Sequence, residues 1–578
     1  MHDLVIRNAR VVDGSGTPAV IADVAVDGGI ITGVGRGVGR ARRVVDADGR
    51  LLTPGWVDIH THYDGQAMWD TQLAPSSWHG VTTVVFGNCG VGFAPVRPGS
   101  EPFLINLMEG VEDIPGTVLA QGLDFRWESF PQYLDALEAT PRTVDVGAQL
   151  PHAALRFYVM GERGADHAAV PTPAEIETMG ALLEDALRAG ALGFSTSRTV
   201  KHRAQDGRPV PSLSAGEAEL LGLADAMRRA GRGVLQVNSD FGPGEFDALR
   251  AAARRSGRPL SVLLLQTDHQ PELWRQTLAD IHAARRDGLD VHVQVGSRAI
   301  GLVMGLETSA HPFSIRPAWR DVADLPPASR FARLRDDAAL RARLLREPPA
   351  RRDVLMQMME RALVKAFPLT EPLDYEPPPS ATLGAQAAAA GRDALELALD
   401  HMLSANGKGL LLYPFENYAA GHYDAVREML ADEATVCGLG DGGAHVGLIC
   451  DASSPTTLLT HWARDRRRGA GLPLEFLVKK QARDTALAYG LTDRGLIAPG
   501  LRADFNVIEF ERLRVRLPEV RYDLPAGGKR VLQRADGYAH TFVAGVETFC
   551  DGEPTGDVPG RLVRSTAGAP GTAPGPRA

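Results

Sequence analysis

The chain has 578 residues, of which 23% are charged and 44% hydrophobic, which is the balance of a folded globular protein. This length accommodates a domain of about 400 residues and a smaller one. The net charge of −9 is spread along the chain without a long basic tract, so we expect neither nucleic acid nor an anionic membrane as partner. We expect a cytoplasmic protein, since no apolar run predicts a signal or membrane segment and the 4 cysteines are scattered.

The first part of the chain, residues 1–55, alternates apolar and polar positions between Gly and Asp turns. The same pattern returns in residues 485–562. Such alternation with frequent turns predicts short antiparallel strands at both ends of the chain. Residues 563–578 are rich in Gly, Pro and Ala, and we expect a disordered tail there.

The central part, residues 56–484, alternates short β-branched runs with Ala- and Leu-rich stretches. The run "GVTTVVFGNCG" predicts a strand over 80–90, and "TPAEIETMGALLEDALRAG" predicts a helix over 172–190. Strand–helix alternation predicts a parallel sheet, and near eight repeats it predicts a closed barrel. The segment at about 302–392 interrupts this rhythm with helical and Pro-rich sequence, so we interpret it as an insertion that serves either as a lid or as a structural appendage.

Two histidines, His60 and His62, stand two apart at the end of the first central strand. Residues i and i+2 of a strand point to the same side, so the two rings can converge on one point. They could be metal ligands, or ordinary histidines with partners in the fold or on its surface. Their place at the carboxyl end of a barrel strand favours the metal, because barrels hold their chemistry at that rim.

Two further residues end predicted strands. Cys89 closes a β-branched run between Asn88 and Gly90, where it is either a small core residue or a thiolate ligand. Asp441 follows a short apolar strand and precedes Gly442, where it is either a turn residue or a metal ligand and general base.

Taken together, these motifs resemble the amidohydrolase superfamily, and within it the N-acyl-D-amino-acid deacylase (D-aminoacylase) branch. The stretches that carry the resemblance are "DLVIRNARVVDG", "LLTPGWVDIHTHYDG", "GVTTVVFGNCG", "GALGFSTSRT", "GLGDGGAH" and "RGLIAPGLRADFNVIEF". The resemblance implies an α/β fold, with a TIM-like (β/α)8 metal-dependent hydrolase barrel over residues 56–484. It also implies a small β-sandwich domain formed by both termini, residues 1–55 and 485–562.

The resemblance also implies a reaction, the hydrolysis of an amide by a water molecule that zinc or another divalent metal activates. Carried over by motif, His60, His62 and Asp441 form one metal site, and Cys89 contributes to a second, tighter one. Asp441 is the implied catalytic base. We expect release of an amino acid, a D-amino acid among the candidates, from an N-acyl derivative. The alternatives are hydrolysis of a cyclic amide or hydantoin and, at lower weight, a non-catalytic, metal-depleted relative that binds a ligand.

The sequence departs from the family where two central strands normally supply histidines, since our registration places Asn238 and Gln266 there. Carboxamides bind zinc poorly compared with imidazole, so we expect one ion rather than two. We favour a single site made by Cys89 together with the two histidines and the aspartate. Asp240, Asp268 and His269 remain alternative ligands.

A second departure concerns the substrate, because "DGGAHVGLICDASSP" lacks the arginine that holds the substrate carboxylate in D-aminoacylases. Arg198 and Arg298 are the leading replacements, since arginine binds carboxylates in a bidentate manner, although either could serve the structure alone. The other expected substrate-binding residues are Tyr63, Asp64, His202 and His445. The expected partner is a small-molecule amide, and self-association stays open.

Overall fold

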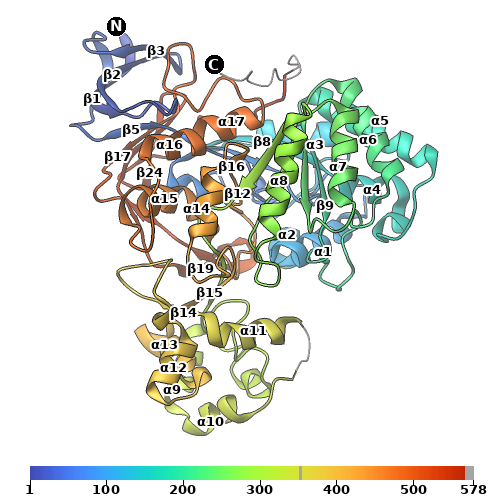
Figure 1. Cartoon of the computed structure of the whole chain (residues 1–578), viewed down its shortest axis with the longest axis vertical. Helices are drawn as coiled ribbons and strands as arrows, with labels where there is room; N and C mark the ends of the chain where they lie inside the picture. The colour runs from blue at the N-terminus through green and yellow to red at the C-terminus, as the bar shows by residue number, and fades with distance from the viewer. Residues whose placement is uncertain (351–353, 567–578) are drawn as a thin grey trace.

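The structure is a computed structural model, and it describes residues 1–350 and 354–566. The predicted tail therefore lies outside the described residues from 567 onward. The molecule has a central barrel, a β-rich part at the N-terminal end, and a lobe formed by the middle of the chain at the opposite end (Figure 1). No helix in the described ranges is long and apolar enough to cross a membrane.

The central sheet confirms the predicted barrel, because its eight strands run parallel in the order β16-β12-β11-β10-β9-β8-β7-β6. The strands are β6 (Trp56–Asp58), β7 (Val81–Phe86), β8 (Asp145–Pro151), β9 (Gly193–Arg198), β10 (Val234–Ser239), β11 (Leu260–Leu263), β12 (Val291–Val295) and β16 (Thr435–Cys437). The longer helices of this part are α1 (Glu101–Glu112), α2 (Gly116–Gly122), α3 (Phe130–Ala139), α4 (His152–Met160), α5 (Pro173–Ala189), α6 (Glu217–Ala230), α7 (Glu245–Ser256), α8 (Leu273–Arg286), α14 (Asp424–Ala431) and α15 (Ser454–Thr460). The strands β7 and β8 are buried along their whole length because helices cover the outside of the barrel.

The barrel closes through loops at the carboxyl ends of its first and last strands. Asp441 donates its backbone N–H to the carbonyl of His60 at 2.9 Å, and His62 donates to the carbonyl of Gly442 at 2.8 Å. These two hydrogen bonds bring the loop after β16 against the loop after β6. Residues that are about 380 positions apart in the chain thereby meet at one rim.

The two termini form one mixed nine-stranded sheet. It consists of β1 (His2–Val11), β2 (Val20–Asp27), β3 (Ile30–Gly35), β4 (Ala41–Asp46), β5 (Leu51–Pro54), β17 (Phe505–Ile508), β22 (Tyr538–Val543), β23 (Val546–Cys550) and β24 (Glu553–Pro554). The two ends of the chain are joined where β5 pairs antiparallel with β17, with Leu52 opposite Val507. Apolar residues from both termini share one buried core around that junction.

The lobe contains the predicted insertion. Its strands β13 (Ile300–Met304), β15 (Leu410–Glu416) and β14 (Phe367–Leu369) form an antiparallel sheet, and the described part of the lobe also contains helices. The helices are α9 (Pro327–Asp336), α10 (Ala338–Arg346), α11 (Val354–Lys365), α12 (Leu383–Ala390) and α13 (Ala394–Gly407). The lobe has an apolar core of its own, with Phe313, Leu334 and Met402 fully buried. A function as a lid stays a prediction.

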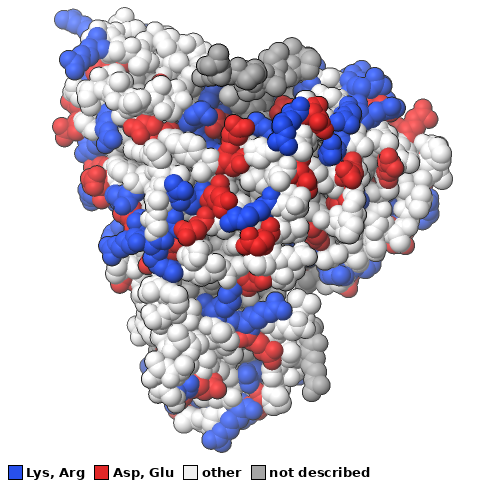
Figure 2. All heavy atoms as spheres, in the orientation of Figure 1, with Lys and Arg blue, Asp and Glu red and all other residues white. Residues whose placement is uncertain are grey.

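The surface in the view of Figure 2 carries acidic and basic side chains interspersed over all three parts. Charges of one sign do not gather there into a broad patch. The expectations about partners and cellular location stay predictions.

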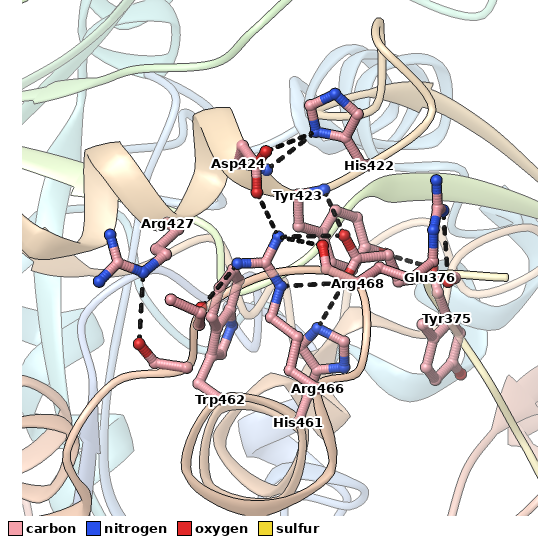
Figure 3. Close-up of polar contacts among 12 residues, drawn as sticks. Tyr375, Glu376, His422, Tyr423, Asp424, Arg427, His461, Trp462, Arg466 and Arg468 are labelled. Atoms are coloured by element: carbon pink, nitrogen blue, oxygen red, sulfur yellow. Dashed lines mark hydrogen bonds and ion pairs between the residues drawn. The ribbon is translucent and has the colours of Figure 1, made fainter. Parts of the chain in front are cut away.

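A buried charge network fastens the Pro-rich end of the insertion to the barrel (Figure 3). Glu376 accepts hydrogen bonds from the Tyr423 backbone at 2.6 Å, from His461 at 3.1 Å and from Arg466 at 3.1 and 3.2 Å. The side chains of Glu376 and Arg466 are 2% and 1% exposed, and Arg466 also reaches Asp424 at 2.7 Å. Breaking a buried pair of this kind typically costs about 3–5 kcal/mol, so this segment is firmly attached.

We expect the stability that Glu376 contributes to depend on pH. Burial by itself would raise the pKa of Glu376, but hydrogen bonds from His461 and Arg466 outweigh it and lower the pKa from 4.5 to about 2. A depressed carboxyl pKa stabilises the fold above the unfolded-state pKa and loses that effect as the pH falls toward 2. Urea unfolding should therefore show Glu376→Gln less stable than wild type by about 3 kcal/mol at pH 7, and by about half of that or less near pH 3.

A matched control is Glu428→Gln, which removes a carboxylate that is 55% exposed and paired with Arg275. Exposed pairs contribute about 0–1 kcal/mol, so this variant should stay close to wild type at both pH values. A difference for Glu376→Gln that does not change with pH would contradict the assigned electrostatic role.

Candidate metal centre

The four residues predicted as metal ligands meet at the carboxyl rim of the barrel. His60 and His62 follow β6, Cys89 follows the adjacent β7, and Asp441 follows β16 across the closing loops. One ligand atom from each of His60, His62 and Cys89 lies within 4.8 Å of the others, and all three residues are buried. A second cluster of this kind, His540 with Glu547 and Cys550, lies in the terminal sheet.

The distances in this site suit one metal ion. His60 Nε2 lies 3.5 Å from Cys89 Sγ and 3.4 Å from Asp441 Oδ1, and His62 Nε2 lies 3.9 Å from the same carboxylate oxygen. Tetrahedral zinc with ligands at about 2.0–2.3 Å places neighbouring ligand atoms about 3.3–3.6 Å apart. The two distances from His60 Nε2 therefore match those between neighbouring zinc ligands, while His62 Nε2 lies slightly farther from the carboxylate.

The second nitrogen of each imidazole lies near an oxygen atom, but only the one of His60 forms a hydrogen bond. His60 Nδ1 lies 2.7 Å from the Gln294 carboxamide oxygen, so this nitrogen carries the hydrogen and Nε2 keeps a free lone pair. His62 Nδ1 faces Glu112 Oε1 at 3.3 Å. Burial lowers the pKa of His60 to about 4 and the pKa of His62 well below its ordinary value. Both rings are therefore neutral at pH 7, which is the form that binds a metal.

The electrostatics of the site also suit a cation. Burial raises the pKa of Asp441 well above its ordinary value, and the neighbouring Asp451 and Asp58 raise it further. Within the described part of the chain, Asp58 Oδ2, Asp64 Oδ2, His62 Nδ1 and Glu112 Oε1 are buried without a hydrogen-bond partner. Buried carboxylates are costly unless a positive charge offsets them. A divalent ion held by two imidazoles, a thiolate and a carboxylate would supply that charge, and this donor set is typical of zinc.

Three residues at this rim have a left-handed backbone. Cys89, Asp441 and His445 adopt left-handed conformations, with φ of 55°, 46° and 49°. Such conformations cost about 1–2 kcal/mol for residues other than glycine and persist where the surrounding structure enforces them. Gly440 leaves no room for a larger residue, because an added Cβ would lie 2.2 Å from Asp58 Oδ2.

The two residues at the positions of the missing histidines differ in their contacts. Asn238 Nδ2 lies 3.6 Å from Cys89 Sγ, next to the site. Gln266 instead binds backbone groups of two turns, accepting from Ala419 N at 3.2 Å and donating to Pro271 O at 3.3 Å. Of these two residues, Asn238 therefore contacts a proposed ligand, Cys89.

The alternative ligands are occupied elsewhere. Asp240 accepts hydrogen bonds from Thr199 Oγ1 at 2.7 Å and Val200 N at 2.8 Å. Asp268 forms an ion pair with Lys365 at 2.7 Å, and His269 is exposed. None of the three is placed by these contacts at the four-residue site.

Both arginines predicted to bind a substrate carboxylate have internal partners. Arg198 forms a two-pronged ion pair with Glu245 and donates to Ala215 O at 2.7 Å. Arg298 is 4% exposed, donates to Cys450 O at 2.7 Å and lies 3.2 Å from Asp451. Their guanidinium groups are therefore engaged in packing the barrel loops.

The remaining predicted substrate-binding residues surround the site at different depths. Tyr63 is fully buried, with its hydroxyl 2.7 Å from Ser76 Oγ, and Asp64 is buried below the rim. His202 is held between Ser197 Oγ at 2.9 Å and Asn238 Nδ2 at 3.3 Å. The His445 side chain is 28% exposed, so it is more open to the rim than the proposed ligand histidines.

Three residues near the site were not predicted. Gln294 on β12 and Glu112 at the end of α1 lie next to the two histidines predicted as ligands. Arg530 comes from the hairpin of β19 (Glu519–Leu524) and β20 (Gly528–Leu532), and together with Asp441 it lines a pocket at the rim. It is ion-paired with Asp523 at 2.8 Å. No short motif marks these positions, since each belongs to an ordinary strand or helix in the sequence.

The chain is similar to known proteins in sequence and in fold. The model of the amidohydrolase family matches residues 43–554. An uncharacterized protein of Mycobacterium bovis is 29% identical over 552 residues, which cover 88% of this chain and 84% of that protein. An N-acyl-D-glutamate deacylase of Alcaligenes xylosoxydans xylosoxydans is 34% identical over 303 residues, covering 51% of this chain and 56% of the relative.

Among solved structures, an N-acyl-D-glutamate deacylase from Bordetella bronchiseptica, complexed with zinc and a phosphonate inhibitor, has the same fold. It is 24% identical, with a TM-score of 0.63 over 97% of this chain and 99% of that one.

Proposed function

Because the chain belongs to the amidohydrolase family, we propose that it is a metal-dependent amide hydrolase that releases an amino acid from an N-acyl derivative, with a D-amino acid as the expected product. The observation that carries this proposal is the convergence of His60, His62, Cys89 and Asp441 at the barrel rim. The similarity to an N-acyl-D-glutamate deacylase supports the acyl-D-amino-acid part of the proposal. We propose zinc or another divalent metal, with one ion rather than two.

The residues of the site have different proposed roles in the reaction. When bound, a divalent cation would polarise the amide carbonyl and acidify water. Asp441, whose Oδ1 lies 3.4 Å from His60 Nε2, would accept the proton of the attacking water and then donate it to the leaving nitrogen. Gln294 holds the His60 ring through Nδ1, so that Nε2 stays aimed into the site.

The internal pairing of Arg198 and Arg298 favours a second candidate, the hydrolysis of a cyclic amide without a free carboxylate. A substrate with a free carboxylate would need another cationic partner at the mouth. Hydrolysis of a cyclic amide needs none.

A substrate panel separates the two candidates. We expect hydrolysis of N-acetyl-D-methionine and not of its L enantiomer, with release of acetate and the free amino acid measured by chromatography. The same protein sample is given hydantoins and dihydropyrimidines as the comparison arm. Activity on the cyclic amides alone would refute the deacylase proposal and support the second candidate.

A further inference from the structure

The last residue of α1, Glu112, reaches the metal centre from outside the set of predicted ligands. It is 1% exposed. Its Oε1 lies 3.3 Å from His62 Nδ1, and its Oε2 lies 3.6 Å from His445 Nε2. One carboxylate therefore faces both a proposed metal ligand and a partly open histidine of the rim. None of the motifs that identify the family includes this residue.

We propose that Glu112 is a positioning residue that fixes the ring of His62 for metal binding and couples it to His445. This inference rests on the proposed function only in that a metal ion is expected at the four-residue site. Glu112 lies at the end of a helix, whereas the motifs that supply the proposed ligands lie at strand ends.

The geometry at the two proposed histidine ligands supports this role. For His60, the nitrogen that points away from the site meets the Gln294 oxygen at 2.7 Å. For His62, the corresponding nitrogen lies 3.3 Å from Glu112 Oε1 without hydrogen-bond geometry, and within the described residues neither atom has a hydrogen-bond partner, so each is the nearest available partner of the other. A hydrogen-bond acceptor behind a ligating imidazole fixes its tautomer and its orientation and raises its basicity. A carboxylate does this more strongly than a carboxamide, because its charge attracts the N–H.

Glu112 also holds the loop that carries Asp441. Its backbone carbonyl accepts a hydrogen bond from the backbone N–H of His445, while its side chain faces the His445 ring. The loop after β16 is thus fastened to the end of α1 by both main chain and side chain. The position of Asp441, four residues before His445, depends on the same attachment.

The charge of Glu112 also links this residue to the metal. In the described part of the chain, no lysine or arginine forms an ion pair with it, and its polar neighbours are the rings of His62 and His445, which burial keeps neutral at pH 7 by lowering their pKa. A buried carboxylate without a cationic partner is unfavourable for the fold. A metal ion bound through His62 would offset that charge through the ring, so metal affinity should depend on Glu112.

The test compares the metal dissociation constants of wild type and Glu112→Gln, measured by competition with a chromogenic zinc chelator. Loss of a carboxylate behind a ligating histidine typically weakens metal binding by about 10–100-fold, and we expect a loss in that range. Glu112→Asp, which keeps the charge on a shorter side chain, should fall between the two. A dissociation constant of Glu112→Gln within about twofold of wild type would overturn the proposal.

A matched control is Glu219→Gln. Glu219 on α6 is also 1% exposed, and its Oε1 lies 3.0 Å from Nε2 of a buried histidine, His152, outside the metal centre. This variant should be less stable than wild type but should bind zinc equally well. Weaker zinc binding by both variants to the same extent would point to general destabilisation and overturn the specific role.

If Glu112→Gln does not fold, the wild-type protein loaded with zinc supplies the second measurement. Nitrogen-15 NMR of the histidine side chains should show His62 protonated at Nδ1, which is the nitrogen that faces Glu112. A His62 ring protonated at Nε2 would overturn the proposal. Because neither experiment uses a substrate, the role of Glu112 and the proposed amide hydrolysis can fail independently of one another.

Discussion

Asp441→Asn is expected to lower kcat on the best substrate of the panel by about 10²–10⁴-fold, which corresponds to about 3–5 kcal/mol of transition-state stabilisation. The amide cannot accept a proton from water or return it to the leaving nitrogen. Asparagine tolerates the left-handed backbone that Asp441 adopts at φ 46°, so the loop should keep its shape. Steady-state kinetics, with circular dichroism to verify folding, are the measurement.

The control for this variant replaces an aspartate that has the same left-handed backbone conformation but lies outside the site. Asp551 has a φ of 48° in a turn of the terminal sheet, where it is exposed. Asp551→Asn should leave kcat within about twofold of wild type, because surface substitutions outside a site have small effects. A fully active Asp441→Asn enzyme would exclude Asp441 as the base.

His60→Ala is expected to abolish both metal binding and hydrolysis. The Nε2 atom of His60 lies 3.5 Å from Cys89 Sγ and 3.4 Å from Asp441 Oδ1, so its removal would take one of the four proposed donors from the site. We expect the zinc content to fall from about one ion per chain to background and kcat/KM to fall at least about 10³-fold, since the metal contributes to both carbonyl polarisation and water activation. Elemental analysis and kinetics on the same preparation are the measurement.

His79→Ala serves as the control, because it removes a buried imidazole that is not a proposed ligand. His79 is also fully buried, burial lowers its pKa to about 4 as it does for His60, and it binds Thr456 and the Gln533 carbonyl away from the site. This variant should lose stability while keeping its zinc. Retention of metal or activity in His60→Ala would mean that the ligand assignment is wrong.

The sequence predicted those parts of the site that sit at strand ends. His60, Cys89 and Asp441 each end an apolar run, and parallel strands deliver their carboxyl ends to one rim, so their convergence followed from the barrel. Glu112 and Gln294 could not be found this way. Glu112 ends an ordinary amphipathic helix, and Gln294 lies within an alternating strand, so only tertiary packing brings them to the histidines.

The partners of the two arginines were likewise beyond local reasoning. Arg198 ends β9, and its guanidinium group forms an ion pair with Glu245 at the start of α7. The pairing of strand β15 could not be predicted from its local sequence either. Its run "LLLYPFE" has the apolar character of a barrel strand, yet it pairs antiparallel with β13 and β14 in the lobe. Apolar runs of this length do not reveal their strand partners.

The proposed reaction depends on a single catalytic metal ion held by His60, His62, Cys89 and Asp441. Its most direct test is a titration of chelator-stripped protein with zinc, following both bound metal and amide hydrolysis. We expect activity to be absent from the stripped protein and to reach its maximum at about one bound ion per chain. A protein that is purified free of metal and stays inert on the whole substrate panel after zinc, cobalt or manganese is added would contradict the proposal.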